Sequence, residues 1–135
     1  MTYGPSNATV FAGNAAAEIA IARDGKSLLV SNRNATSFDI ANPDPKNVTR
    51  IPSDTMAEFS IGVDGVVAFG ELTPAGGAFP RHFSENKEGS LVAVGLQNSG
   101  RVVIYEKCKI TGKMGKDVLA DFGGLGGVTN VVWGE

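Results

Sequence analysis

The sequence contains few of the residues that bind metals or form covalent cross-links. Among its 135 residues there are one cysteine, one histidine and one tryptophan. The single cysteine, Cys108, excludes a disulfide within the chain. Lysines stand on both sides of it and would lower the pKa of an exposed thiol, but we interpret Cys108 as an incidental thiol at the end of a strand. We expect neither a metal nor a cofactor.

Basic clusters and long apolar segments are also lacking. The chain carries 12 Lys and Arg against 14 Asp and Glu, for a formal charge of −2, and it has no run of basic residues. This balance argues against a nucleic-acid partner. No apolar segment approaches the roughly 20 residues of a membrane-spanning helix, and the N-terminus lacks the basic and apolar regions of a signal peptide. A small soluble partner is the more natural expectation.

The cellular location is left open by three N-glycosylation sequons, which begin at Asn7, Asn34 and Asn47. Such a tripeptide is common by chance in a chain rich in Asn and Thr, so each one is weak evidence for secretion. We favour a cytoplasmic location and keep secretion as the alternative.

Glycine is the abundant residue, with 18 copies beside six prolines, whereas charged residues make up only 19% of the chain. This composition is typical of many short strands joined by tight turns rather than of long helices. The length fits one domain. We therefore predict an all-β fold.

The first half of the chain alternates strand and turn patterns. Glu18–Ile21 has the alternation of a half-buried strand, Asp24-Gly25 readily forms a type I′ turn, and Ser27–Ser31 is typical of a buried strand. The proline-rich residues 41–55 predict a surface insertion, because proline cannot donate to a strand ladder. The other elements expected here are a polar connection over 32–36 and strands over 56–63 and 66–72.

The second half has the same layout, centred on the stretch from Gly76 to Tyr105. This stretch predicts a loop, a short strand, a Glu88-Gly89 turn, a buried strand, an Asn-Ser-Gly turn and a third strand. A polar edge strand is predicted over 114–122, and a final strand over 128–133 after a glycine-rich connection.

The two halves align as a repeat. Matching Asp24-Gly25 with Glu88-Gly89 gives an offset of 64 residues, from 24 to 88. The residues that this offset pairs include Glu18 with His82, Ala17 with Arg81, Val30 with Val94, Arg33 with Gln97 and Asn34 with Asn98. Without the insertion each unit is about fifty residues long, within the range of four-stranded propeller blades.

We therefore predict a partial β-propeller with about two four-stranded antiparallel meanders and one terminal strand. Closed propellers usually have four to eight blades, and open blade faces expose apolar surface. We expect the chain to be the C-terminal part of a longer protein, with self-association into a ring as the alternative. The predicted parts are a loop at 1–15, a first blade at 16–73 with its insertion at 41–55, a second blade at 74–122 and a strand of a further blade at 128–133.

Both halves contain short characteristic motifs: Ala16–Ile19, Asp24–Lys26 and Val30–Arg33 in the first, then Phe79–Phe83, Val94–Asn98 and Gly100–Val103 in the second. Together they resemble the lactonase-type seven-bladed β-propellers, which include bacterial 6-phosphogluconolactonases and fungal carboxy-cis,cis-muconate cyclases. The resemblance covers nearly the whole chain but only the last two to two and a half blades of that fold. It implies an enzyme that acts on a small anionic lactone or a muconate-like carboxylate, and the Phe-Pro-Arg-His and Val-Gly-Leu-Gln segments favour the cyclase branch.

The resemblance also implies roles for polar residues near the channel, where propellers bind ligands. Glu18 or His82 would be the general acid or base, and Arg81 is the third catalytic candidate. Arg33 and Arg81 would hold a carboxylate or phosphate. The remaining substrate-binding candidates are Gln97, Asn32 and Asn98.

Each candidate also has a structural explanation. His82 can cap an inner strand, Glu18 can pair with an arginine, and Arg81 can bind loop carbonyls. The asparagines suit turn conformations, and we expect Trp133 to serve packing.

The alternatives to an enzyme are a non-catalytic propeller module that binds a protein or sugar, and an inactive truncated product. The enzyme hypothesis predicts that the acidic, basic and histidine candidates converge on one accessible cleft. The binding-module hypothesis predicts an exposed aromatic or apolar patch on the blade rim, with the inner polar groups paired to one another.

Overall fold

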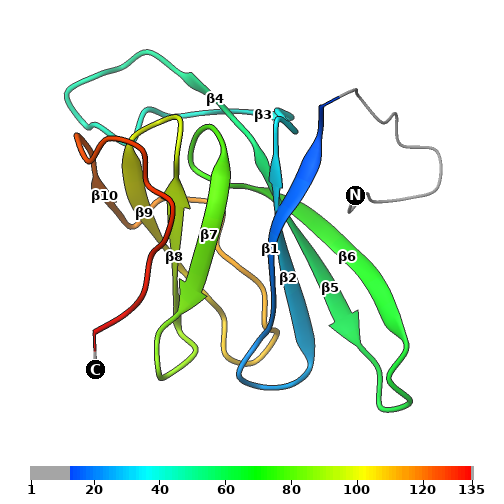
Figure 1. The fold of residues 1–135 in the computed structure, drawn as a ribbon. Helices are drawn as coiled ribbons and strands as arrows, with labels where there is room; N and C mark the ends of the chain where they lie inside the picture. The colour runs from blue at the N-terminus through cyan, green and yellow to red at the C-terminus, as the bar shows by residue number, and fades with distance from the viewer. Residues whose placement is uncertain (1–12, 135) are drawn as a thin grey trace.

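The computed structural model of the protein describes residues 13–134. Every regular element in this range is a β-strand, which confirms the all-β prediction (Figure 1). The ten strands are β1 (Ala15–Ile21), β2 (Ser27–Arg33), β3 (Phe38–Ile40), β4 (Ile51–Ser53), β5 (Thr55–Ile61), β6 (Val67–Pro74), β7 (Pro80–Glu85), β8 (Leu91–Leu96), β9 (Arg101–Glu106) and β10 (Ala120–Phe122). None of the described residues forms a helix long and apolar enough to cross a membrane.

Two four-stranded antiparallel sheets make up most of the molecule. Their strand orders are β1-β2-β5-β6 and β7-β8-β9-β10, and β3 pairs with β4 in a separate two-stranded sheet. The first strand of the second sheet, β7, contacts both β1 and β2 (Figure 1). The first strands of the two sheets are therefore neighbours, as the inner strands of successive propeller blades are.

Strand register reproduces the repeat that the sequence predicts. Ile19 lies opposite Val30 in the first sheet, and Phe83 lies opposite Val94 in the second, 64 residues further along. The two tight turns are also alike, since Gly25 and Gly89 both adopt the positive φ angles that glycine tolerates. Local turn chemistry thus sets the same pairing in both blades.

The hydrophobic core lies between the two sheets. The second sheet contributes most of it, because alternate residues of β8 and β9 point toward the first sheet. The buried members are Leu29, Met56, Ala75, Phe83, Val92, Val94, Leu96, Val103, Tyr105 and Met114. Burying one such large side chain stabilises a fold by about 1.5–3 kcal/mol, so this contact is what holds the two blades together.

The predicted insertion at 41–55 is shorter in the structure, where only residues 41–50 and Asp54 lack regular structure. Ile51–Ser53 forms strand β4, contrary to the expectation that its proline would prevent pairing. Pro52 lies opposite Asp39, and β4 pairs with β3 alone. An edge position of this kind tolerates proline, because no neighbour needs the missing N–H.

The edge strand predicted over 114–122 is mostly wrong, since only its last three residues form β10. Gly115 N–H donates to Glu106 O, and Leu119 N–H donates to Ile104 O. The segment therefore advances four residues, from 115 to 119, while β9 covers only two, from 106 to 104. The two extra residues bulge out of the ladder. Met114 keeps a single isolated bridge to Lys107.

The final strand predicted over 128–133 does not form. The segment nevertheless lies beside β7, and runs down the molecule in red in Figure 1. Its contacts with β7 use side chains, so no backbone ladder develops. The predicted loop at 1–15 falls mainly outside the described residues, as does the sequon at Asn7, and β1 already begins at Ala15.

Candidate functional site

Glu18 and His82 meet between the two first strands. Glu18 Oε2 lies 3.4 Å from His82 Nε2, and the two side chains are 34% and 23% exposed. Both residues stand at register shifts, since β1 is irregular between Ala16 and Ile19 and β7 between Pro80 and His82. Such bulges turn side chains out of the regular alternation and are common beside active sites. The repeat therefore brings its two matched polar positions into contact.

Each side chain of the pair has a second partner. Glu18 Oε1 accepts the N–H of Ile19 at 3.1 Å. His82 Nδ1 accepts the N–H of Val131 at 3.3 Å, from the C-terminal segment. The imidazole is thus held from two sides, by β1 through Nε2 and by the chain end through Nδ1.

A cleft of about 450 Å³ lies along β1 and β7 at this pair. Its lining residues are Glu18, Ala20, Ile21, Ala22, Arg23, His82, Phe83, Ser84 and Glu85. The polar pair occupies one part of the cleft, and apolar side chains together with the charged residues Arg23 and Glu85 complete it. None of the other predicted site residues lines this cleft.

Arg33 and Gln97, which the repeat matches, both contact Phe79. The Arg33 guanidinium carbon lies 5.2 Å from the centre of the Phe79 ring, and Gln97 N–H donates to Phe79 O at 2.9 Å. Arg33 Nη2 also donates to Ala16 O at 3.2 Å, two residues before Glu18. Arg33 Nε and Gln97 Oε1 are buried without a hydrogen-bond partner among residues 13–134. These two polar atoms are therefore unpaired within the described residues and enclosed, and a ligand would reach them only after a side chain turns.

The remaining predicted residues differ in their surroundings. Arg81 is exposed on β7, and its guanidinium has no partner within the described part of the chain. Asn32 is buried, and its Nδ2 donates to Thr55 Oγ1 at 3.2 Å. Asn98 is exposed in the turn after β8. The structure therefore gathers Glu18 with His82 and Arg33 with Gln97, while Arg81, Asn32 and Asn98 lie apart from these contacts.

Asp54 is an important residue that the sequence did not reveal. It is 2% exposed, and its Oδ2 accepts the N–H groups of Asn34 and Phe79 at 3.1 and 2.8 Å. Its Oδ1 accepts the Thr36 hydroxyl at 2.8 Å. Asp54 therefore fixes the chain after β2 and the chain before β7. The sequence shows only an aspartate at the end of a proline-rich segment, which resembles an ordinary turn residue.

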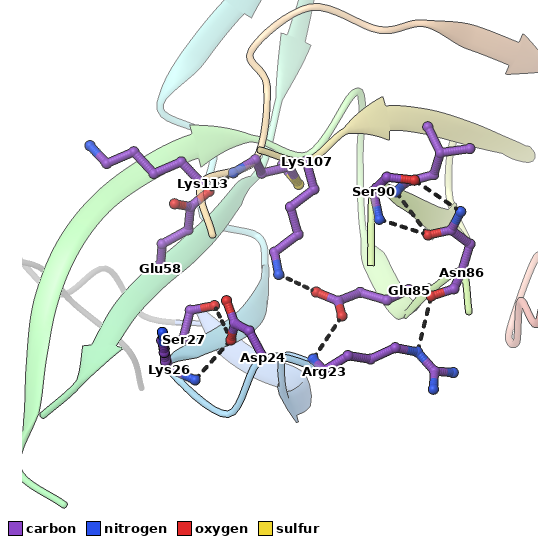
Figure 2. Close-up of polar contacts among 12 residues, drawn as sticks. Arg23, Asp24, Lys26, Ser27, Glu58, Glu85, Asn86, Ser90, Lys107 and Lys113 are labelled. Atoms are coloured by element: carbon purple, nitrogen blue, oxygen red, sulfur yellow. Dashed lines mark hydrogen bonds and ion pairs between the residues drawn. The ribbon is translucent and has the colours of Figure 1, made fainter. Parts of the chain in front are cut away.

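A second missed group joins the blades through the β1–β2 turn (Figure 2). Lys107 Nζ lies 2.6 Å from Glu85 Oε1, and both side chains are at least 90% buried. Glu85 Oε2 accepts the backbone N–H of Arg23 at 3.0 Å, and Arg23 Nε donates to Asn86 O. These residues come from distant positions in the sequence, so their spacing gives no warning of the contact.

Cys108 is exposed, and its pKa lies below the usual value. The main cause is a hydrogen bond with the Thr111 side chain, followed by the backbone N–H groups of Thr111 and Ile110. The flanking lysines, which the sequence suggested, are not the cause. No cluster of three or more His, Cys, Asp or Glu side chains suited to a metal ion occurs in residues 13–134.

Comparisons with known proteins agree with this architecture. Residues 2–124 match the family model described as lactonase, seven-bladed β-propeller. A protein from Lactobacillus plantarum has a similar structure, with a TM-score of 0.69, 25% identity, and coverage of 93% of this chain and 30% of that one. No curated protein matches.

Two further solved structures are similar. A periplasmic gluconolactonase from Pseudomonas aeruginosa gives a TM-score of 0.67 at 21% identity, covering 90% of this chain and 30% of that one. A protein from Bacteroides fragilis assigned as a 6-phosphogluconolactonase gives 0.65 at 20% identity, covering 85% and 27%. The chain therefore spans less than a third of the length of these structures.

Proposed function

Because the chain belongs to the seven-bladed β-propeller lactonase family, we propose that it is part of a lactonase-type propeller acting on a small lactone through Glu18 and His82. The observation that carries this proposal is the 3.4 Å contact between Glu18 Oε2 and His82 Nε2. It joins the first strands of two successive blades beside an open cleft. A carboxylate and an imidazole in contact can move a proton at neutral pH.

Lactone hydrolysis requires one proton acceptor and one proton donor. The oxygen of a water forms a bond with the lactone carbonyl carbon, and the ring C–O bond breaks. The Glu18 carboxylate takes the proton that the water loses, and the pair returns a proton to the ring oxygen as it leaves. One water is consumed, and the product is a hydroxy acid.

The other polar residues suggest how a substrate would be held. Arg33 and Arg81 lie outside the lining of the cleft, so they would supply positive charge for a carboxylate or phosphate on a substrate that extends beyond it. Once the Gln97 side chain turns toward a ligand, its acceptor Oε1, which is unpaired among the described residues, suits a hydroxyl donor. A hydroxylated sugar lactone has such donors, whereas a muconate at neutral pH has only acceptors. This difference favours a sugar lactone that carries an anionic group.

A muconate-like cyclisation is the second candidate, and the pair of arginines favours it. In that reaction a substrate carboxylate oxygen adds to a double bond, and Glu18 or His82 delivers a proton to the adjacent carbon. Arg33 and Arg81 would hold the other carboxylates. The buried acceptor on Gln97 is the feature that this candidate leaves without a role.

The non-catalytic alternative also has support. Ile19 and Ile21 are 59% and 64% exposed on β1, and the inner polar groups Glu18 and His82 are paired with each other. The pairing was expected of a binding module, whereas the expected apolar patch was on the blade rim and these two isoleucines lie on an inner strand. An inactive product is a further alternative, because the chain spans only about 30% of the length of its structural neighbours and other blades or self-association would have to complete a channel.

Turnover assays on the 135-residue chain test these alternatives. We expect hydrolysis of 6-phosphogluconolactone to exceed conversion of 3-carboxymuconate, and Glu18→Gln to reduce it at least tenfold. Arg81→Ala is expected to raise KM more than it lowers kcat. Hydrolysis that Glu18→Gln leaves unchanged would contradict the proposed role of the pair, and preferred turnover of the muconate would select the second candidate. A folded chain with no turnover of either substrate would support the non-catalytic alternatives.

A further inference from the structure

The C-terminal segment from Val128 to Trp133, called the C-terminal strap below, lies along β7 and ends the described chain. Ser84 Oγ donates to Val131 O at 3.0 Å, and Trp133 Nε1 donates to Ser84 O at 2.9 Å. Val128 is 8% exposed. A Cβ placed on Gly95 would lie 2.9 Å from a Val128 methyl group, so the strap packs closely on β8 as well. It is a fixed part of the fold.

The strap also contacts the candidate site directly. Its Val131 N–H donates to His82 Nδ1 at 3.3 Å, while His82 Nε2 faces Glu18 Oε2 at 3.4 Å. A backbone N–H can only donate, so Nδ1 must carry a free lone pair. The neutral imidazole then bears its proton on Nε2, where the Glu18 carboxylate accepts it.

The other neutral tautomer does not suit these surroundings. With the proton on Nδ1, two donors would face each other at Val131, and the bare Nε2 would face an anionic oxygen. Both contacts would be lost together. The partner of one ring nitrogen commonly decides the state of the other in this way.

We infer that the C-terminal strap is a positioning element for the Glu18–His82 pair, and that Val131 N–H selects the Nε2–H tautomer of His82. In that tautomer His82 donates to Glu18 and orients its carboxylate. Glu18 is then the group that accepts a proton from water, and His82 does not act as the first base. This division of roles rests on the proposed function, whereas the selection of the tautomer does not.

The tautomer can be read directly in the 135-residue chain, because His82 is its only histidine. A long-range ¹H–¹⁵N spectrum at neutral pH contains one imidazole and distinguishes Nε2–H, Nδ1–H and imidazolium forms. We expect the wild-type chain to show the Nε2–H form. The variant Val131→Pro lacks the donor, and loss of one hydrogen bond worth about 1 kcal/mol reduces the preference for this form roughly fivefold.

Val132→Pro is the matched control. It places the same residue one position further, where the side chain is 75% exposed and the N–H has no acceptor among the described residues. We expect it to keep the wild-type ring spectrum. If Val131→Pro does not fold, Trp133→Phe loosens the strap by removing only the indole donor, and a smaller shift in the same direction is expected. Unchanged ring shifts in the folded donor variant, or an Nδ1–H form in the wild type, would overturn the inference.

Kinetics separate this inference from the proposed function. With 6-phosphogluconolactone as substrate, Val131→Pro should lower kcat by about the factor by which the Nε2–H form is reduced, and leave KM nearly unchanged. A changed tautomer with unchanged turnover would support the strap and contradict the role of the pair in catalysis. An unchanged tautomer in Val131→Pro would overturn the inferred role of the strap, whatever the turnover of the variant.

Discussion

Asp54 Oδ2 accepts the backbone N–H of Phe79 at 2.8 Å across 25 residues of sequence. The same oxygen accepts the N–H of Asn34. Phe79 and Asn34 have φ angles of 66° and 53°, and they are the only non-glycine residues of the described chain with positive φ. Such conformations persist when the surroundings hold them. One buried carboxylate thus holds two unfavourable backbone conformations beside Arg33 and Gln97.

Replacing Asp54 should destabilise the fold strongly. Asp54→Ala leaves two backbone N–H groups and the Thr36 hydroxyl without an acceptor, and we expect a loss of about 3 kcal/mol in the free energy of unfolding. Asp54→Asn is the matched control, because one amide oxygen can still accept both N–H groups while Thr36 can accept from the amide nitrogen. We expect it to cost about 1 kcal/mol. Urea unfolding measures both values, and equal costs would contradict the assigned contacts.

The buried pair of Lys107 and Glu85 yields a second stability prediction (Figure 2). Lys107→Met leaves the Glu85 carboxylate buried with only the Arg23 N–H as a partner. Removing one member of a buried pair typically costs about 3–5 kcal/mol, and we expect a value in that range. The double variant Lys107→Met, Glu85→Met should recover part of this loss, because no unpaired charge remains.

An exposed pair gives the comparison. Arg50 and Asp39 are 59% and 68% exposed, and Asp39→Asn should change the free energy of unfolding by less than about 1 kcal/mol. For the buried pair, urea unfolding of Lys107→Met, Glu85→Met and the double variant completes the thermodynamic cycle. A Lys107→Met variant as stable as Asp39→Asn would show that the buried pair, which links the end of β7 to the residue after β9, does not stabilise the fold.

Glu58 is a buried carboxyl that weakens the fold at neutral pH. Burial, the largest effect, raises its pKa above the ordinary 4.5, the Met114 N–H opposes this, and the nearby Glu71 raises it further. A carboxyl with a raised pKa costs stability where it must ionise in the folded state. Glu58→Gln should therefore increase the free energy of unfolding at pH 7, since glutamine still accepts the Met114 N–H.

The pH dependence follows from the same shift. The gain in the free energy of unfolding from Glu58→Gln is fully present above the raised pKa of Glu58. It declines as the pH falls through that pKa and disappears below pH 4.5. Urea unfolding at pH 7 and pH 4 measures the change. If the free energies of unfolding of the wild type and Glu58→Gln differ by the same amount at both pH values, the raised pKa of Glu58 is not the cause.

Cys108 offers a prediction about reactivity rather than stability. The hydrogen bonds from Thr111 and Ile110 lower its pKa, so a larger fraction of the thiol is ionised at neutral pH. Thr111→Val removes the side-chain donor and should slow alkylation by iodoacetamide, whereas Thr111→Ser should not. Replacing the flanking Lys109 to remove its charge should have a smaller effect. The reverse order would restore the interpretation based on the lysines.

Turn chemistry explains why the strand register could be predicted from the sequence. Asp24-Gly25 and Glu88-Gly89 are local signals, and once they fix the hairpins the opposed pairs follow without knowledge of the rest of the fold. The contact between Glu18 and His82 follows from the same repeat, because matched positions on adjacent inner strands lie near each other. That part of the candidate site required no long-range information.

The missed features depend on contacts between distant segments. Nothing near Asp54 indicates that residues 34 and 79 will bury it, and nothing near Lys107 indicates Glu85. The segment after Met114 has strand-like composition, yet its hydrogen bonds to β9 leave an unmatched bulge. Val128–Trp133 likewise has strand-like composition but bonds to side chains. Periodicity predicts which residues favour strands, and tertiary partners decide whether the ladder forms.

Gly95 should control how closely the C-terminal strap can approach. It lies opposite His82 in the strand pairing, and an added Cβ would stand 2.9 Å from a Val128 methyl group, closer than such atoms can pack. Gly95→Ala should therefore push the strap outward and weaken the Trp133–Ser84 hydrogen bond, at a cost of about 1–3 kcal/mol. Trp133 is the only tryptophan, so its fluorescence reports on the strap alone, and we expect a red-shifted emission with stronger quenching by acrylamide. Gly127→Ala is the control, since its added Cβ would meet only Gln97 Cγ at an ordinary 4.0 Å. Identical emission from Gly95→Ala and Gly127→Ala would mean that the strap is not seated on β8.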